Sequence, residues 1–103
     1  MIELELNIEG KKKTFKQQEV SARVMRECIK FYEKAEKEEM SDLEAVDAMI
    51  VIVAGAFQDP DVTFDSILDG LSAKDLAPVL QRVFEQINDL GSDEKKSAGK
   101  KKK

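Results

Sequence analysis

Few residues in this chain could carry out chemistry, because it has no histidine and a single cysteine, Cys28. Without an imidazole, nucleophilic or general acid–base catalysis would have to use carboxylates, lysines or the Cys28 thiol. No pair of these groups has a recognisable catalytic spacing, and the motifs G-x-x-x-x-G-K, G-x-G-x-x-G, C-x-x-C and H-E-x-x-H are absent from the sequence. Cys28 stands among apolar residues of a predicted helix, which favours a buried structural thiol. The sequence therefore predicts no enzyme and no cofactor.

Four oxygen-bearing residues have the odd-numbered spacing that begins a calcium-binding loop: Asp59, Asp61, Thr63 and Asp65. Such a loop needs a glycine where this chain has Phe64, and a bidentate glutamate where it has Gly70. The segment is better explained if Thr63 caps a short helix over residues 64–69, with Asp65 near the positive end of that helix and Gly70 closing it. We therefore predict no metal site.

A cluster of lysines could bind an anion or a nucleic-acid backbone: Lys11, Lys12, Lys13 and Lys16. The charge balance argues against this role, since residues 91–103 carry +4 and residues 1–90 carry −8, and an acidic body repels phosphate. In a hairpin these lysines would face Glu3, Glu5 and Glu9 and protect an exposed sheet edge. We predict no nucleic-acid partner. The alternative function is a small helical regulator that binds nucleic acid through residues 11–16 and the C-terminal tail.

The N-terminal residues predict a β-hairpin. Apolar and polar residues alternate strictly over residues 2–8, Glu9-Gly10 supplies a tight turn, and residues 11–16 return as a second strand with Phe15 pointing inward. A two-stranded hairpin is marginally stable alone, so its apolar face must lie on helices. The N-terminus is acidic where a secretory signal would be basic and then apolar, which predicts a cytosolic protein.

Three helices are predicted besides the short one. The first is capped by Ser21, extends to about Glu39, and has a core stripe of Val24, Met25, Cys28, Ile29, Phe31, Tyr32 and Ala35. The last begins at Ser72, tolerates Pro78 near its start, ends at Gly91, and has a core stripe of Leu76, Val79, Leu80, Val83, Phe84, Ile87 and Leu90. Residues 91–103 form a lysine-rich tail without large apolar groups, and we expect it to be disordered.

The central helix, over residues 41–57, is the most apolar stretch, and the other segments are expected to cover it. Ser41 and Glu44 form a capping box at its start. Its uncharged part is about half of the roughly 20 residues that a membrane span needs, so no membrane contact is predicted. One face belongs to the core, with Leu43, Val46, Ile50, Val53, Ala54 and Phe57, and the opposite face has small or apolar residues at positions 45, 48, 52, 55 and 56.

This second face has two explanations. Either the chain wraps the helix on both sides, or the face is a surface for self-association or for a partner helix. Under the second explanation the predicted partner-binding residues are Ala48, Val51, Ile52 and Gly55. Together the patterns predict an α+β, mostly helical fold, in which an N-terminal β-hairpin packs on a bundle of about four helices. We expect residues 1–90 to form one domain.

The order of these features resembles the tail assembly chaperones of long-tailed (siphophage-type) bacteriophages. The resemblance rests on IELELNIEGKKKTFK at residues 2–16, VSARVMRECIKFYEK at residues 20–34, a mostly apolar helix, and VTFDSILDGLSAKDLAPVLQRVFEQI at residues 62–87. In that family a strand, a G-K turn and a T-F-K-like strand precede the helices. A phrase like F-D-x-[IL]-x-D-G-[IL]-x-A-x-[ED]-L leads into the last helix, and residues 64–65, 68–71 and 73–76 match it.

The resemblance implies a protein that acts in the host cytoplasm and is absent from the mature virion. It implies binding to the tape measure protein, which the chaperone keeps soluble while tail tube subunits assemble around it. The family commonly makes a longer product by ribosomal frameshifting, and the added domain recruits the tube protein. A homo-oligomer is also expected. The resemblance carries no residue motif for the tape measure contact, so the predicted binding residues come only from the helical pattern.

Overall fold

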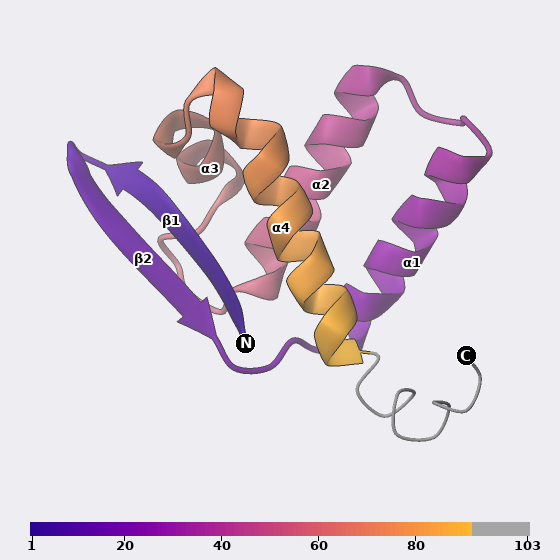
Figure 1. Cartoon of the computed structure of the whole chain (residues 1–103), viewed down its shortest axis with the longest axis horizontal. Helices are drawn as coiled ribbons and strands as arrows, with labels where there is room; N and C mark the ends of the chain where they lie inside the picture. Colours follow the sequence, from indigo (N-terminus) through magenta and orange to yellow (C-terminus); the bar gives the residue numbers. More distant parts are fainter. Residues whose placement is uncertain (92–103) are drawn as a thin grey trace.

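A computed structural model describes residues 1–91 of the chain. Within them an antiparallel hairpin precedes four helices (Figure 1): β1 (Ile2–Ile8), β2 (Lys11–Gln17), α1 (Ala22–Glu36), α2 (Asp42–Ala56), α3 (Phe64–Gly70) and α4 (Ala73–Gly91). This architecture confirms the predicted α+β, mostly helical fold. The tail predicted for residues 91–103 lies, except for Gly91, outside the described residues.

The hairpin forms because a two-residue turn brings its strands into register. Glu9 and Gly10 have φ angles of 54° and 80°, and two successive positive values give the turn whose twist matches that of antiparallel strands. Ile2 then pairs with Gln17, and Ile8 with Lys11. The predicted alternation is confirmed, since three residues of β1 and one of β2 bury their side chains: Ile2, Leu4, Leu6 and Phe15.

The predicted pairing of the lysines with strand glutamates is correct only for Lys16, whose Nζ lies 3.5 Å from Glu3 Oε2. The register places Lys11 opposite Ile8, and Lys12 and Lys13 opposite Asn7 and Leu6. The outer edge of β1 also carries a contact from a helix, because the Glu3 N–H donates to Gln86 Oε1 of α4 at 2.9 Å.

Side-chain caps begin the helices where the sequence predicted them. Ser21 Oγ accepts a hydrogen bond from the Val24 N–H, and Ser41 and Glu44 form a reciprocal capping box. A second box joins Thr63 and Ser66 at the start of α3. α1 ends at Glu36, earlier than predicted, because its last carbonyls accept from the Lys37 and Glu38 N–H groups and the chain then turns with Glu38 at φ 55°.

The core is one cluster that receives residues from all six elements. Figure 1 shows α4 crossing the molecule between the hairpin and the α1–α2 pair, in agreement with its contacts to β1, α1 and α2. The largest fully buried side chains are Phe84, Ile2, Leu6, Ile50, Ile67, Leu80, Ile87, Val53, Val83 and Cys28. The predicted core stripe of α4 is confirmed, because all of its members are buried or half-buried.

Four core-stripe assignments in α1 and α2 are wrong. Ile29 and Tyr32 are 51% and 42% exposed, and Ala35 is exposed as well, because α1 packs mainly on α2 and α4 and the other elements of residues 1–91 leave its outer side uncovered. Leu43 is 69% exposed, since the whole first turn of α2 lies beyond the core. On the second face of α2, Ile52 and Ala56 are 9% and 2% exposed, so the chain covers this part of the face.

Gly70 allows the C-terminus of α3 to lie against β1. A Cβ atom at this position would stand 3.0 Å from both the Asn7 carbonyl oxygen and the Leu6 Cβ, which is closer than ordinary van der Waals contact. Backbone of a paired strand moves little, so glycine is required here for packing.

We expect Gly70→Ala to destabilise the fold by about 1–3 kcal/mol, because the added methyl overpacks the contact between α3 and β1. Gly55→Ala is the matched control: nothing lies within 4 Å of its Cβ position, so better helix propensity is expected to stabilise α2 by up to about 1 kcal/mol. Urea unfolding followed by circular dichroism measures both changes. Equal effects of the two substitutions would contradict the packing explanation.

Candidate partner-binding groove

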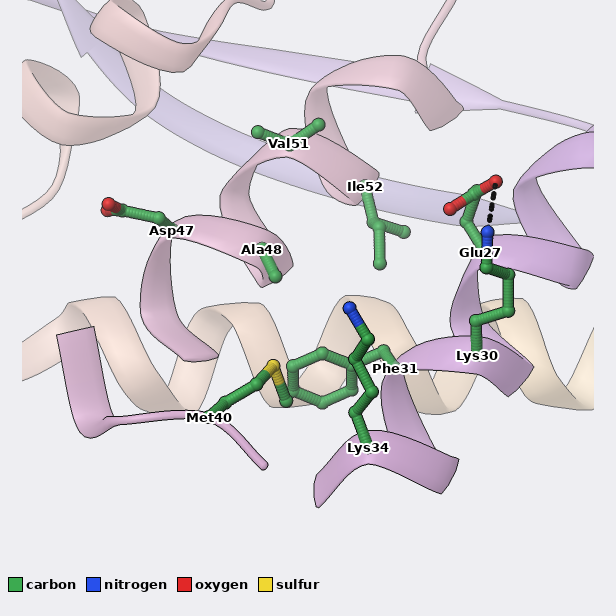
Figure 2. A pocket seen from close by; sticks show the side chains of 9 residues that line it. All are labelled: Glu27, Lys30, Phe31, Lys34, Met40, Asp47, Ala48, Val51 and Ile52. Carbon is green, nitrogen blue, oxygen red and sulfur yellow. Dashed lines mark ion pairs between the residues drawn. The ribbon is translucent and has the colours of Figure 1, made fainter. Parts of the chain in front are cut away.

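A groove of about 410 Å³ runs between α1 and α2 (Figure 2). The chain joins these two helices as an antiparallel helical hairpin (Figure 1). We call this groove the α1–α2 groove. It is lined by Glu27, Lys30, Phe31, Lys34, Met40, Asp47, Ala48, Val51 and Ile52. The volume is enough for a few large side chains and too small for a helix backbone, so a partner helix would lie over it and insert side chains.

Three of the four predicted partner-binding residues line this groove. Val51 is 59% exposed, Ala48 is half-buried, and Ile52 is only 9% exposed and belongs to the core cluster. Gly55 is exposed on the next turn of α2, outside the groove lining. The structure therefore brings these residues together in two roles: Val51 and Gly55 offer surface, and Ile52 supports the floor. Their function as a binding site stays a prediction.

The floor of the α1–α2 groove is held in place by aromatic packing. Phe31 lies edge-to-face against Phe84 of α4, with ring centroids 5.3 Å apart, and against Tyr32 at 5.8 Å. Figure 2 shows the Met40 side chain pointing toward the Phe31 ring, and Ile52 pointing toward Phe31 from α2. The floor is thus preformed, apolar and continuous with the core.

The two rims of the groove carry opposite net charges, since Glu27 offsets only one of the two lysines on the α1 side. Lys30 and Lys34 lie on the α1 rim, where Lys30 Nζ is 3.9 Å from Glu27 Oε2, and Figure 2 shows Lys34 extending toward α2. The α2 rim carries Asp47, which points away from α1. Analysis of one helix at a time missed these residues. The sequence pattern that could have identified the α1 residues is the spacing of positions 27, 30, 31 and 34, which places charged groups around Phe31 on one face of α1.

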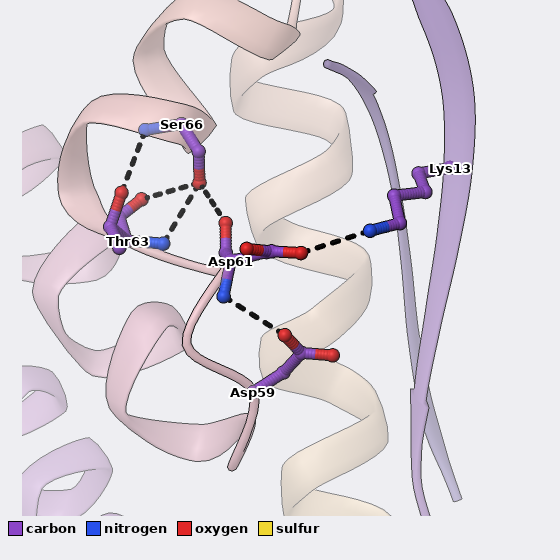
Figure 3. A network of polar contacts seen from close by, with 5 residues as sticks. All are labelled: Lys13, Asp59, Asp61, Thr63 and Ser66. Carbon is purple, nitrogen blue, oxygen red and sulfur yellow. Dashed lines mark hydrogen bonds and ion pairs between the residues drawn. The ribbon is translucent and has the colours of Figure 1, made fainter.

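The aspartates of the loop between α2 and α3 bind groups of the chain itself (Figure 3). The Asp61 N–H donates to Asp59 Oδ1, and Asp61 Oδ2 lies 2.9 Å from Lys13 Nζ on β2. Ser66 Oγ donates to the Asp61 carbonyl oxygen at 2.8 Å. The hydrogen bond to Asp61 raises the pKa of Lys13, so this ammonium stays charged. The network therefore ties the hairpin to the α2–α3 loop.

Cys28 is fully buried, as predicted. Burial, together with the charge of Glu27, raises the pKa of its thiol from 9.0 to about 11. Near neutral pH the group is therefore a protonated thiol, which is neither an effective nucleophile nor a metal ligand.

A family model described as "Phage tail chaperone protein" matches residues 1–103 of the chain. The chain belongs to this family. No curated protein matches it, and no solved structure does. The resemblance drawn from the hairpin and the 62–87 segment is thus confirmed.

Membership indicates a non-enzymatic role for this tail chaperone, exercised in the host during tail assembly and on tail proteins. Two of the four clustered lysines, Lys13 and Lys16, have carboxylate partners within the chain, and the absence of a nucleic-acid partner stays a prediction. Over residues 1–91, no helix combines the length and the apolar content that crossing a bilayer requires.

The raised pKa of Cys28 predicts a specific pH dependence of stability. Between about pH 9 and pH 11 the unfolded chain loses the thiol proton while the native chain keeps it, so the free energy of unfolding falls by up to about 1.4 kcal/mol for each pH increment of one. Urea unfolding at pH 8, 9, 10 and 11 measures this slope. Cys28→Ala is expected to show a shallower decline over the same range, and an identical slope in both proteins would contradict the assignment.

Proposed function

We propose that this tail chaperone binds the tape measure protein of its phage in the host cytoplasm and keeps it soluble while the tail tube assembles. The observation that carries the proposal is the apolar surface left exposed along α2 beside the α1–α2 groove, where Leu43 and Val51 are the two most exposed large hydrophobic residues among residues 1–91. Exposed contiguous apolar surface is typical of sites that bind other proteins.

Leu43, Val51 and Gly55 belong to one i, i+4 row of α2, in which Asp47 stands between Leu43 and Val51. Leu43 and Val51 are 69% and 59% exposed and stand eight residues apart, which is slightly more than two helical turns. Gly55 follows Val51 by one turn, and nothing lies within 4 Å of its Cβ position. A glycine inside a helix costs about 1 kcal/mol relative to alanine, and no contact within the described fold requires one here. A partner helix could approach the backbone at this position.

Charge suits the same role. Residues 1–90 carry −8, and charged residues make up 37% of the sequence, so the surface away from α2 is well solvated. Like-charged copies covering an apolar client repel one another and keep the complex dispersed. One 11.6 kDa domain covers only a short length of a client helix, so many copies per client and contacts between copies are part of the proposal.

The test is co-expression of the tape measure protein of the same phage with and without this chain, followed by centrifugation and size-exclusion chromatography. Val51→Glu is expected to lower the soluble client at least severalfold, because it places a charge where an apolar side chain of the client would lie. Leu68→Glu, at a 42% exposed apolar position on α3, is the matched control and should retain activity. A client that is equally soluble without this chain would refute the proposal.

The proposal includes a longer, frameshifted form that recruits the tail tube protein and, like the short form, is absent from the mature virion. Lysine codons are rich in A, so residues 100–103 allow a slippery A-run in the gene. We expect expression of the native gene to give a minor extended product, detectable by mass spectrometry. Synonymous AAG codons at these four positions should abolish it, and an unchanged product would contradict the slippage site.

A further inference from the structure

We infer that the α1–α2 groove selects a partner helix whose apolar stripe is bordered by carboxylates on the edge that faces α1. The inference rests on the proposed function and adds the chemistry by which a client segment is recognised. It follows from three properties of the groove: its apolar floor, the lysines of its α1 rim, and the absence of lysine or arginine from its α2 rim.

The floor sets the first requirement. Phe31, Met40, Ala48 and Ile52 form a surface that water can reach but cannot hydrogen-bond, and Val51 extends it onto the outer side of α2. A partner gains most by inserting branched or aromatic side chains here, at about 25 cal/mol per Å² of apolar area buried. In a helix, residues spaced three and four apart supply such a row, so the partner element is an amphipathic helix.

The α1 rim sets the second requirement. Lys30 and Lys34 are four residues apart, which places their Cα atoms about 6 Å apart along the helix axis. Among residues 1–91, Lys34 makes no ion pair, and Lys30 has only the 3.9 Å contact to a Glu27 side chain that Arg26 also approaches, at 3.6 Å. These ammonium groups therefore remain open to carboxylates on a neighbouring helix, and a pair spaced one turn apart matches their separation.

The α2 rim sets the direction in which the partner helix lies in the groove. Asp47 is the charged residue that α2 contributes to the groove, and a second acidic edge on the partner would be repelled by it. A helix with carboxylates on one edge of its apolar stripe and neutral or basic residues on the other edge fits only in one direction. Such charge complementarity contributes more to specificity and orientation than to affinity.

The experiment uses the full chain and two synthetic amphipathic peptides of about 20 residues, long enough to form a helix on binding. Both carry the same leucine stripe. One has glutamates along one edge and the other has lysines at the same positions. Fluorescence anisotropy is expected to show about tenfold tighter binding of the acidic-edge peptide. The lysine-edge peptide loses two attractions to Lys30 and Lys34 and gains two repulsions, each of several tenths of a kcal/mol or more. The preference should shrink at 0.5 M salt.

The double variant Lys30→Glu/Lys34→Glu is expected to reverse the preference. Lys11→Glu/Lys12→Glu changes the net charge equally at the hairpin turn, far from the groove in sequence, and should leave the preference as it is. Thermal unfolding of both variants checks that they fold. Equal binding of the two peptides by the wild type, or a reversed preference in both variants, would overturn the inference.

Two further outcomes would also overturn it. If light scattering shows a wild-type oligomer that Lys30→Glu/Lys34→Glu dissociates while neither peptide binds, a second copy of this chain occupies the groove. If the peptides show no preference while the chain still keeps the tape measure protein soluble, the charge selection is wrong and the proposed function stands. If the tape measure protein is no more soluble with the wild-type chain than without it, the proposed function itself is refuted.

Discussion

A two-stranded hairpin cannot keep its own apolar face away from water, and this constraint decides where the helices lie. Ile2, Leu4 and Leu6 of β1 are covered by α4 and by the end of α3, where Gly70 permits direct contact between the helix terminus and the strand. α4 contacts the hairpin, α2 and α1 through its single buried stripe. The ion pair between Lys13 and Asp61 holds the loop that follows α2 to the same hairpin.

Because α3 and α4 pack against the hairpin, α1 packs on one side only, against α2 and α4. It contributes Val24 and Cys28 to the core and rests Phe31 on Phe84, while Ile29 and Tyr32 stay largely exposed. An edge helix of this kind leaves a groove against its neighbour, because no further element among residues 1–91 fills the space above Phe31. The candidate binding surface is thus a consequence of how the elements share the core.

Local patterns predicted the parts of the fold that depend on local physics. Strict alternation identified β1, and hydroxyl caps at Ser21, Ser41 and Thr63 located three helix starts, since these signals act within a few residues. Burial was predicted less well, because it depends on which neighbour covers each face: Leu43 was expected in the core and is 69% exposed for that reason. The helical wheel of α2 found Val51 and Gly55, but it could not reveal the groove, whose other wall is supplied by α1.

The bond from the Glu3 N–H to Gln86 Oε1 bears on a hazard that any small open sheet faces. An unpaired strand edge is a template for another strand, and chains held close together add to one another through it until they aggregate. Here the Gln86 side-chain amide oxygen accepts a hydrogen bond from a backbone N–H on the outer edge of β1. The lysines of β2 give the opposite edge a positive charge, which repels the same edge of another copy. Both features act against the joining of sheets from neighbouring copies into fibres.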